Sequence, residues 1–242
     1  MTALKPSWYS SAKEGIVSDF INLLHPPYTL WHLSYVLIGI AMSPVIFIDR
    51  SIWVLVAFFL GLGLGAHALD ETMGNPLRTR ISKKWLYSIG FGSLSLAILI
   101  GAYFVVKLSI LILPFVVMES FFAVAYNLEM FEKRFHTDIV FALSWGSIPF
   151  LTGYFVNSLS ISAASLVMAL GIGLLTFVQR TLSTQARLFR RKIDAVQSIN
   201  LANGETIPTS SKELISPAEK SLKALTVMIF TISIALILIR IS

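Results

Sequence analysis

One segment, residues 61–80, combines small, acidic and basic side chains at a spacing that suits metal or phosphate chemistry. His67, Asp70 and Glu71 follow one another at i, i+3 and i+4, so a helix places their side chains on one face. Gly74 then ends this helix. The two carboxylates fall in its last turns, where the negative end of the helix dipole disfavours each of them by about 0.3 to 1 kcal/mol. A cationic companion is therefore expected beside them.

Two companions are consistent with this segment. Arg78 and Arg80 can fold back to pair with Asp70 and Glu71, or the carboxylates can hold Mg²⁺ through oxygen ligands, with His67 as a third candidate ligand. In the second case the same arginines would clamp a diphosphate bridged by the metal, because a guanidinium group matches phosphate oxygens bidentately. The residues themselves leave both readings open.

Further polar residues lie within or beside long apolar runs. Glu119 falls inside a run, where a charge costs on the order of 2.5 to 3.5 kcal/mol, so its side chain should face the interior of a helical bundle. It either lines a cavity or relays protons, or it is a protonated or hydrogen-bonded packing residue. Lys133 and Arg134 are interpreted as anchors at the membrane surface or as contacts to a phosphate.

The elements that must position these residues are transmembrane helices. The chain has 242 residues, of which 55% are hydrophobic and 13% charged, and its mean hydropathy is +0.76, values that exclude an ordinary soluble domain. A bilayer core about 30 Å thick needs roughly 20 apolar residues per helix. The sequence therefore predicts an all-α, polytopic membrane bundle with seven crossings near residues 29–48, 51–71, 85–106, 108–127, 138–157, 161–181 and 222–241.

The distribution of positive charge predicts the orientation. Of the 19 Lys and Arg residues, only Arg50, Lys107 and Arg240 fall on the side opposite the N-terminus. The positive-inside rule then places the N-terminus in the cytoplasm and the C-terminus outside the cell membrane, in a multi-pass protein. The net charge of +6 is thus a topology signal that suits anionic lipids and gives no reason to expect nucleic-acid binding.

We expect a single membrane domain with four parts: an N-terminal interfacial segment over 1–27, a six-helix core over 28–181, a basic cytoplasmic loop over 182–221 and a final crossing over 222–242. Within the first part, residues 9–24 have the pattern of an amphipathic interfacial helix. Residues 182–197 extend the sixth crossing as a basic stretch, interpreted as resting on anionic headgroups. Residues 200–211 are expected to be flexible, and Ser216 to Glu219 are expected to begin the last helix.

Several short motifs occur in an order that resembles the UbiA-type intramembrane prenyltransferases, over roughly residues 20–180. They are His25-Pro-Pro-Tyr-Thr-Leu, Arg78-Thr-Arg80-Ile, the stretch from Tyr126 to Arg134, Trp145-Gly146 and Gly153-Tyr154. In that family a motif of the form N-D-x-x-D-x-x-x-D, at the cytoplasmic end of the second helix, binds Mg²⁺ and the prenyl diphosphate. Asp70 looks like its central Asp.

The resemblance implies Mg²⁺-dependent transfer of a prenyl group from an isoprenoid diphosphate to a lipophilic acceptor. Asp70 and Glu71 would hold the metal, and the diphosphate would be bound by Arg78, Arg80, Lys133 and Arg134. The carbocation would be shielded or steered by Tyr126, Asn127 and Glu119.

The chain departs from the family pattern in ways that favour other functions. Ala66 and His67 stand at the Asn-Asp positions, Gly74 replaces the last Asp, and the second Asp-rich motif is replaced by residues 179–187, Gln-Arg-Thr-Leu-Ser-Thr-Gln-Ala-Arg. One alternative is a non-catalytic member of the fold that binds lipid or a protein partner, as a homo- or hetero-oligomer. Another, a small transporter, draws support from Glu119 alone.

Overall fold

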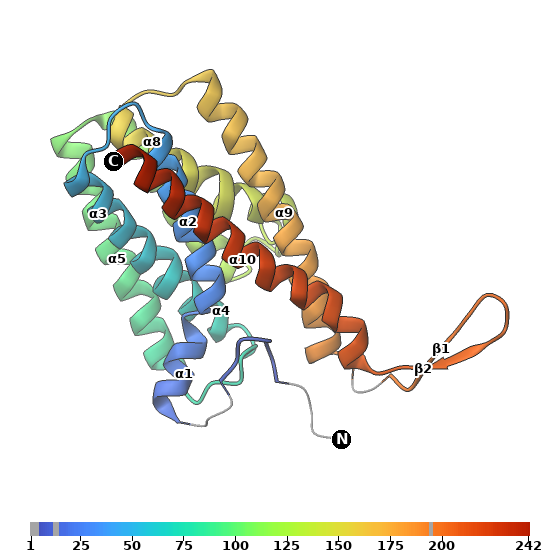
Figure 1. Cartoon of the computed structure of the whole chain (residues 1–242). Helices are drawn as coiled ribbons and strands as arrows, with labels where there is room; N and C mark the ends of the chain where they lie inside the picture. The colour runs from blue at the N-terminus through green and yellow to red at the C-terminus, as the bar shows by residue number, and fades with distance from the viewer. Residues whose placement is uncertain (1–4, 12–14, 194–195) are drawn as a thin grey trace.

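The computed structural model describes residues 5–11, 15–193 and 196–242, and within them the chain is a bundle of long helices. Six helical segments are long and apolar enough to cross a membrane: Ile48–Thr72, Lys83–Lys107, Ile110–Asn127, Asp138–Ser158, Ala163–Arg191 and Ser211–Ile241. A seventh helix, α2 (Pro26–Met42), has 17 residues and lies among them (Figure 1). The all-α membrane bundle predicted from the sequence is confirmed.

Two of these segments contain a wider, π-helical turn. The second span consists of α3 (Ile48–Phe58), η1 (Phe59–Ala66) and α4 (His67–Thr72), and the fifth of α7 (Asp138–Ala142), η3 (Leu143–Ser147) and α8 (Ile148–Ser158). The other elements are α1 (Ile16–Leu23), α5 (Lys83–Lys107), η2 (Ile110–Ile112), α6 (Leu113–Asn127), α9 (Ala163–Arg191), α10 (Ser211–Ile241) and the strands β1 (Ser198–Asn200) and β2 (Thr206–Pro208). π-Helical turns are frequent at functional sites. Here η1 runs directly into α4, which carries His67 and Asp70, and η3 contains Trp145.

Helix α2 is the central element, and it is in close contact with α8. A Cβ atom on Gly39 would lie 2.1 Å from the carbonyl oxygen of Phe150, and one on Gly153 would lie 2.4 Å from that of Val36. Side chains therefore do not fit between the two helices at these positions, and the backbones approach each other directly. Helix α10 runs across α2 on another side (Figure 1).

Lys5, the first described residue, and Ser242, the last residue, lie at opposite ends of the bundle (Figure 1). At one end, Arg190 donates to the backbone oxygen of Lys5, at 2.9 Å. At the other end, Arg240 of α10 donates to the backbone oxygens of Ser43 and Pro44, at 3.2 and 2.9 Å. This arrangement is the one that seven crossings require. That the Lys5 end faces the cytoplasm stays a prediction from the charge distribution.

The structure corrects two predicted helix boundaries. The first crossing ends at Met42, and not near residue 48, because residues 43–47 form a connection held by the amide side chain of Asn157, which accepts from the backbone N–H of Phe47 at 2.8 Å. The last helix begins at Ser211, five residues before the predicted Ser216.

The reason for the second error is that two capping patterns lie close together. The hydroxyl of Ser210 accepts from the backbone N–H of Glu213, and the Glu213 carboxylate accepts from the backbone N–H of Ser210, which makes a capping box. Pro217, predicted in the first turn, lies inside the helix instead.

The flanking segments also differ from expectation. Residues 198–208, which overlap the predicted flexible connection over 200–211, include a two-stranded antiparallel hairpin that projects from the bundle (Figure 1). The predicted interfacial helix is shorter than expected: α1 begins at Ile16, and the predicted positions 12–14 lie outside the described residues. Its exposed apolar side chains, Ile16 and Phe20, suit contact with a membrane surface.

Candidate functional site

A polar cavity of about 760 Å³ lies at the Lys5 end of the bundle. We call it the basic cavity. Its lining comes from the N-terminal segment, the start of α2, α4, the end of α6, the segment before α7 and the last turns of α9. The lining residues that carry the argument are Tyr9, His25, His67, Asp70, Tyr126, Asn127, His136, Gln179, Arg180, Arg187 and Arg191.

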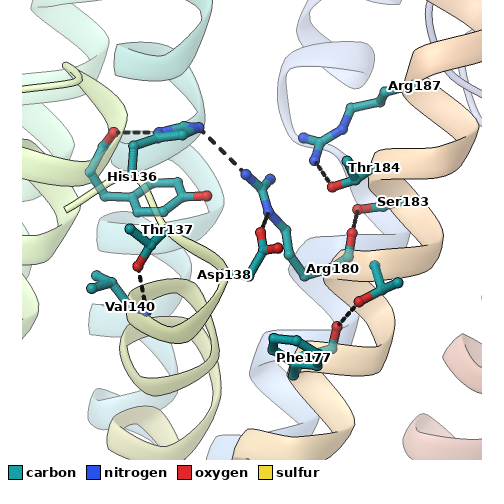
Figure 2. A network of polar contacts seen from close by, with 11 residues as sticks. His136, Thr137, Asp138, Val140, Phe177, Arg180, Ser183, Thr184 and Arg187 are labelled. Carbon is teal, nitrogen blue, oxygen red and sulfur yellow. Dashed lines mark hydrogen bonds and ion pairs between the residues drawn. The ribbon is translucent and has the colours of Figure 1, made fainter. Parts of the chain in front are cut away.

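Three arginines of α9 line one side of the basic cavity. Arg180, Arg187 and Arg191 are spaced at i, i+7 and i+11, which is close to two and three turns of a helix, so they lie along one side of α9. Arg187 donates to the hydroxyl of Thr184 at 3.1 Å (Figure 2), and Arg191 donates to the backbone oxygen of Pro6 at 3.1 Å. Most N–H groups of the Arg187 guanidinium remain available to a ligand.

Arg180 joins α9 to the start of α7. Its Nε donates to the Asp138 carboxylate at 3.1 Å, and a terminal nitrogen lies 3.4 Å from Nε2 of His136 (Figure 2). The side chain of Arg180 is only 10% exposed, whereas that of Asp138 is 50% exposed. This contact fixes the direction of a buried guanidinium at the cavity wall.

Aromatic rings form the wall beneath Arg180. The ring centroids of Tyr126, Phe141 and Trp145 lie 5.6 to 5.9 Å from one another. The guanidinium carbon of Arg180 lies 5.0 Å from the Phe141 centroid and 5.8 Å from that of Tyr126. The rings of Phe141 and Tyr126 thus already contact a cation of the protein, Arg180, and the Tyr126 ring also stacks on that of His136.

His25 and His67 also line the basic cavity. The hydroxyl of Tyr9 lies 2.9 Å from Nδ1 of His25, and the His25 ring stacks on that of His67. Burial lowers the pKa of His25 well below its usual value, with further lowering from His67, Arg191 and Arg187. Burial likewise raises the pKa of Tyr9. Both groups are thus neutral at pH 7, and a Tyr9 hydroxyl that donates to Nδ1 would place the ring proton of His25 on Nε2.

Three buried polar atoms at the basic cavity have no hydrogen-bond partner among the described residues. They are Nε2 of His25, the hydroxyl of Tyr126 and the side-chain oxygen Oε1 of Gln179. Leaving such a group unsatisfied costs about 1 to 3 kcal/mol each. The three residues come from separate segments of the chain and all line the basic cavity, although the three atoms themselves are buried beneath its surface.

The structure brings four of the predicted site residues to this cavity: His67, Asp70, Tyr126 and Asn127. Asp70 lines the same cavity as Arg187 and Arg191, and it forms no ion pair within 4 Å among the described residues. The positive charge expected near its helix end is therefore present in the cavity, on α9, without a direct contact. The prediction that Arg80 supplies it by pairing with Asp70 or Glu71 is wrong, because Arg80 pairs with Asp19 of α1 at 2.9 Å.

Glu71 is turned away from the cavity and organises the loop that follows α4. Its carboxylate accepts from the backbone N–H groups of Leu77 and Thr79, at 3.0 and 3.2 Å, and from the Thr79 hydroxyl at 3.1 Å. The side chain is buried. Both carboxylate oxygens of Glu71 are thus hydrogen-bonded within the protein. Glu71 therefore does not join Asp70 as a second metal ligand in the cavity, as the sequence predicted.

The four predicted diphosphate-binding residues lie outside the lining of the basic cavity. Arg78, Arg80 and Arg134 are exposed, and Lys133 forms an exposed i,i+4 pair with Glu129 at 2.8 Å. Surface ion pairs of this kind contribute little to stability. The loop positions that the family resemblance suggested are thus replaced, as the cationic groups near Asp70, by the arginines of α9.

Glu119 lies in a different hollow from Tyr126 and Asn127. It precedes Tyr126 by seven residues in α6, which corresponds to roughly 10 Å along a helix. The hollow around it has an apolar lining and shares no lining residue with the basic cavity. The predicted grouping of Glu119 with the other site residues is therefore wrong.

No protein-family model, curated protein or solved structure matches this chain. Sequence reasoning missed Arg180, Arg187 and His25 as site residues. A signal was present, because residues 179–187 occupy the place of the second acidic motif and carry arginines two turns apart.

Proposed function

We propose that this chain binds the diphosphate group of an isoprenoid lipid in the basic cavity and transfers the prenyl group to a lipophilic acceptor. The observation that carries the proposal is the row of Arg180, Arg187 and Arg191 beside buried polar atoms that lack partners. Arginine matches phosphate oxygens with paired N–H donors. Tyr126 and His25 also line the cavity, and a phenol O–H or an imidazole N–H is a donor that suits phosphate oxygens.

The surroundings of the arginine row suit an allylic substrate. When the bond between the prenyl carbon and the diphosphate breaks, both electrons leave with the diphosphate and the prenyl group becomes a cation. The arginines stabilise the departing charge, and the aromatic rings of Tyr126, Phe141 and Trp145 line the cavity beside the cation. The acceptor then bonds to that carbon and loses a proton, which Asp70, a carboxylate of the cavity lining, would accept.

The Mg²⁺ ion implied by the family resemblance fits this donor set poorly. Among the described residues no group of three or more His, Cys, Asp or Glu could hold a metal ion. Glu71 is committed to the loop, and the Nδ1 atom of His67 lies 3.2 Å from the backbone oxygen of Gly63. We therefore propose that the arginines of α9, and not a metal ion, balance the negative charge of the diphosphate.

A second candidate function is binding of the same lipid without catalysis. The observation that favours it is the small number of carboxylates: of the lining residues, only Asp70 and Glu129 are acidic, and Glu129 pairs with Lys133. Both candidates predict lipid binding in the same cavity. They differ in whether inorganic diphosphate is released.

The test uses the whole protein in lipid nanodiscs with radiolabelled geranylgeranyl diphosphate. We expect saturable binding, weakened about tenfold or more in Arg187→Gln, since a charge-assisted hydrogen bond contributes about 1.5 to 3 kcal/mol. The exposed Arg134→Gln is the matched control and should bind normally. Absence of binding in the unaltered protein would reject both candidates, whereas binding without diphosphate release in the presence of extracted membrane lipids would select the second.

A further inference from the structure

A small pocket within the membrane-spanning region contains a single carboxyl group. We call it the Glu119 pocket. It has a volume of about 80 Å³ and lies between the second span, α5, α6 and α8, with a lining that is apolar except for Glu119, Ser120 and Thr152. The two hydroxyls are already bonded, because Ser120 donates to the Val116 backbone oxygen and Thr152 to that of Ile148.

The carboxyl group of Glu119 is the unexplained feature of this pocket. Both of its oxygens are buried, and neither has a hydrogen-bond partner among the described residues. No Lys, Arg or His belongs to the lining. An ionised carboxylate without a cation is very costly in an apolar environment, so the group is carried as the neutral acid. A neutral acid has one O–H donor and acceptor oxygens still to be satisfied.

Water satisfies this group poorly. An ordered buried water needs two to four polar partners, and Glu119 is the one lining group here whose side chain is not already bonded within its own helix. A ligand with an apolar body and one hydroxyl suits the pocket better. A hydroxyl both donates and accepts, so it can form a two-way pair with a carboxylic acid while its carbon chain contacts the apolar walls.

The pocket reaches the outer surface of the bundle at the depth of the membrane. Ile98 of α5 is exposed, and Val116 and Ser120 of α6 are half-buried, so the rim lies on the flank formed by these two helices. A ligand would enter from the surrounding lipid. The volume holds the hydroxyl and a few carbons, and the rest of the chain would extend into the bilayer.

We propose that the Glu119 pocket is a binding site for a hydroxyl-bearing lipid, with the lipid hydroxyl paired to the carboxyl group of Glu119. The site is separate from the basic cavity and does not depend on the proposed prenyl transfer. A protonated amine is a poorer match, because an ion pair in this lining would have to overcome the desolvation of both charges.

The probe is hexadecanol that carries a diazirine near its hydroxyl end, compared with the same chain without the hydroxyl, and the protein is studied in nanodiscs. We expect light-induced labelling of α5 and α6 residues by the alcohol, competed by unlabelled farnesol and at least about tenfold weaker for the alkane. Equal labelling by alcohol and alkane would overturn the proposal.

Three variants change the pocket in different ways. Glu119→Leu removes the hydrogen-bonding group and also an unsatisfied buried carboxyl, so it should fold normally and lose the alcohol labelling. Glu119→Gln keeps a donor and an acceptor and should retain it. Ala97→Phe fills the pocket from α5 and should also abolish labelling, and unchanged labelling in both Glu119→Leu and Ala97→Phe would refute the assignment. Arg187→Gln, which weakens the basic cavity, should label normally.

Discussion

The imidazole rings of His25 and His67 lie stacked, with centroids 4.2 Å apart and an angle of 11° between their planes. His25 precedes α2 and His67 begins α4, so the stack joins the first two crossings at the floor of the basic cavity. Two stacked imidazoles cannot both carry a proton without strong repulsion at this distance. Their contact therefore makes the cavity sensitive to acid.

We expect the stability of the protein to fall as the pH drops below about 6.5. Burial and the neighbouring His67, Arg191 and Arg187 lower the pKa of His25, so the folded protein holds this histidine neutral while the unfolded chain takes up a proton. Because the unfolded state then binds more protons, acid favours unfolding, and the contribution of His25 vanishes above the unfolded pKa. The measurement is the apparent melting temperature in detergent between about pH 5 and 8.

The matched variant for this measurement is His25→Asn. His25 has a left-handed backbone conformation, with φ +45°, which asparagine tolerates better than most residues. The variant lacks the titrating ring, so its melting temperature should depend less steeply on pH below about 6.5. An identical pH profile in the variant and the unaltered protein would show that His25 is not the group responsible.

The carboxylate of Glu71 provides a second prediction, which concerns stability. Glu71→Ala removes the acceptor for the backbone N–H groups of Leu77 and Thr79. Thr79 keeps the side-chain oxygen of Asn75, at 2.9 Å, whereas Leu77 is left buried without an acceptor. We expect a loss of about 1 to 3 kcal/mol in the free energy of unfolding, measured by denaturant titration.

Exposed Glu132 supplies the control, since Glu132→Ala should leave stability within about 0.5 kcal/mol of the unaltered protein. Lipid diphosphate binding, measured well below the melting temperature, should survive in Glu71→Ala. Normal stability combined with lost binding would instead place Glu71 at the ligand, as a metal-holding residue would require.

Much of the fold can be predicted from the sequence because a bilayer requires a minimum length of apolar residues in every helix that crosses it. The crossings recur as apolar runs, and the alternation of charge assigns each loop to an end of the bundle. Exact ends are harder to predict, since they depend on single hydrogen bonds. At the last helix both Ser210 and Ser216 offer a capping pattern, and nothing local to the sequence decides between them.

The candidate site was only partly predictable for a related reason. Sequence spacing places Asp70, Tyr126 and Asn127 near the ends of their helices, on the same side of the membrane. It does not tell which cation meets Asp70, because Arg80 lies ten residues away and Arg187 more than a hundred. Arg80, which is nearer in the sequence, forms an ion pair with Asp19 instead, and this contact depends on the position of α1.

The sign of the effect of Asp70→Asn on ligand binding distinguishes arginine binding from metal binding. If the α9 arginines hold the diphosphate, Asp70 is a like charge in the same cavity, and its neutralisation should tighten binding of geranylgeranyl diphosphate by about threefold to tenfold. A chelator of Mg²⁺ should then leave the affinity unchanged, while added salt weakens it by screening. If Asp70 holds a metal ion that bridges to the diphosphate, the same substitution should weaken binding and the chelator should abolish it.

Isothermal titration of the protein in nanodiscs, with and without the chelator, separates the two cases, and tighter binding by Asp70→Asn in the absence of metal is the result that we expect.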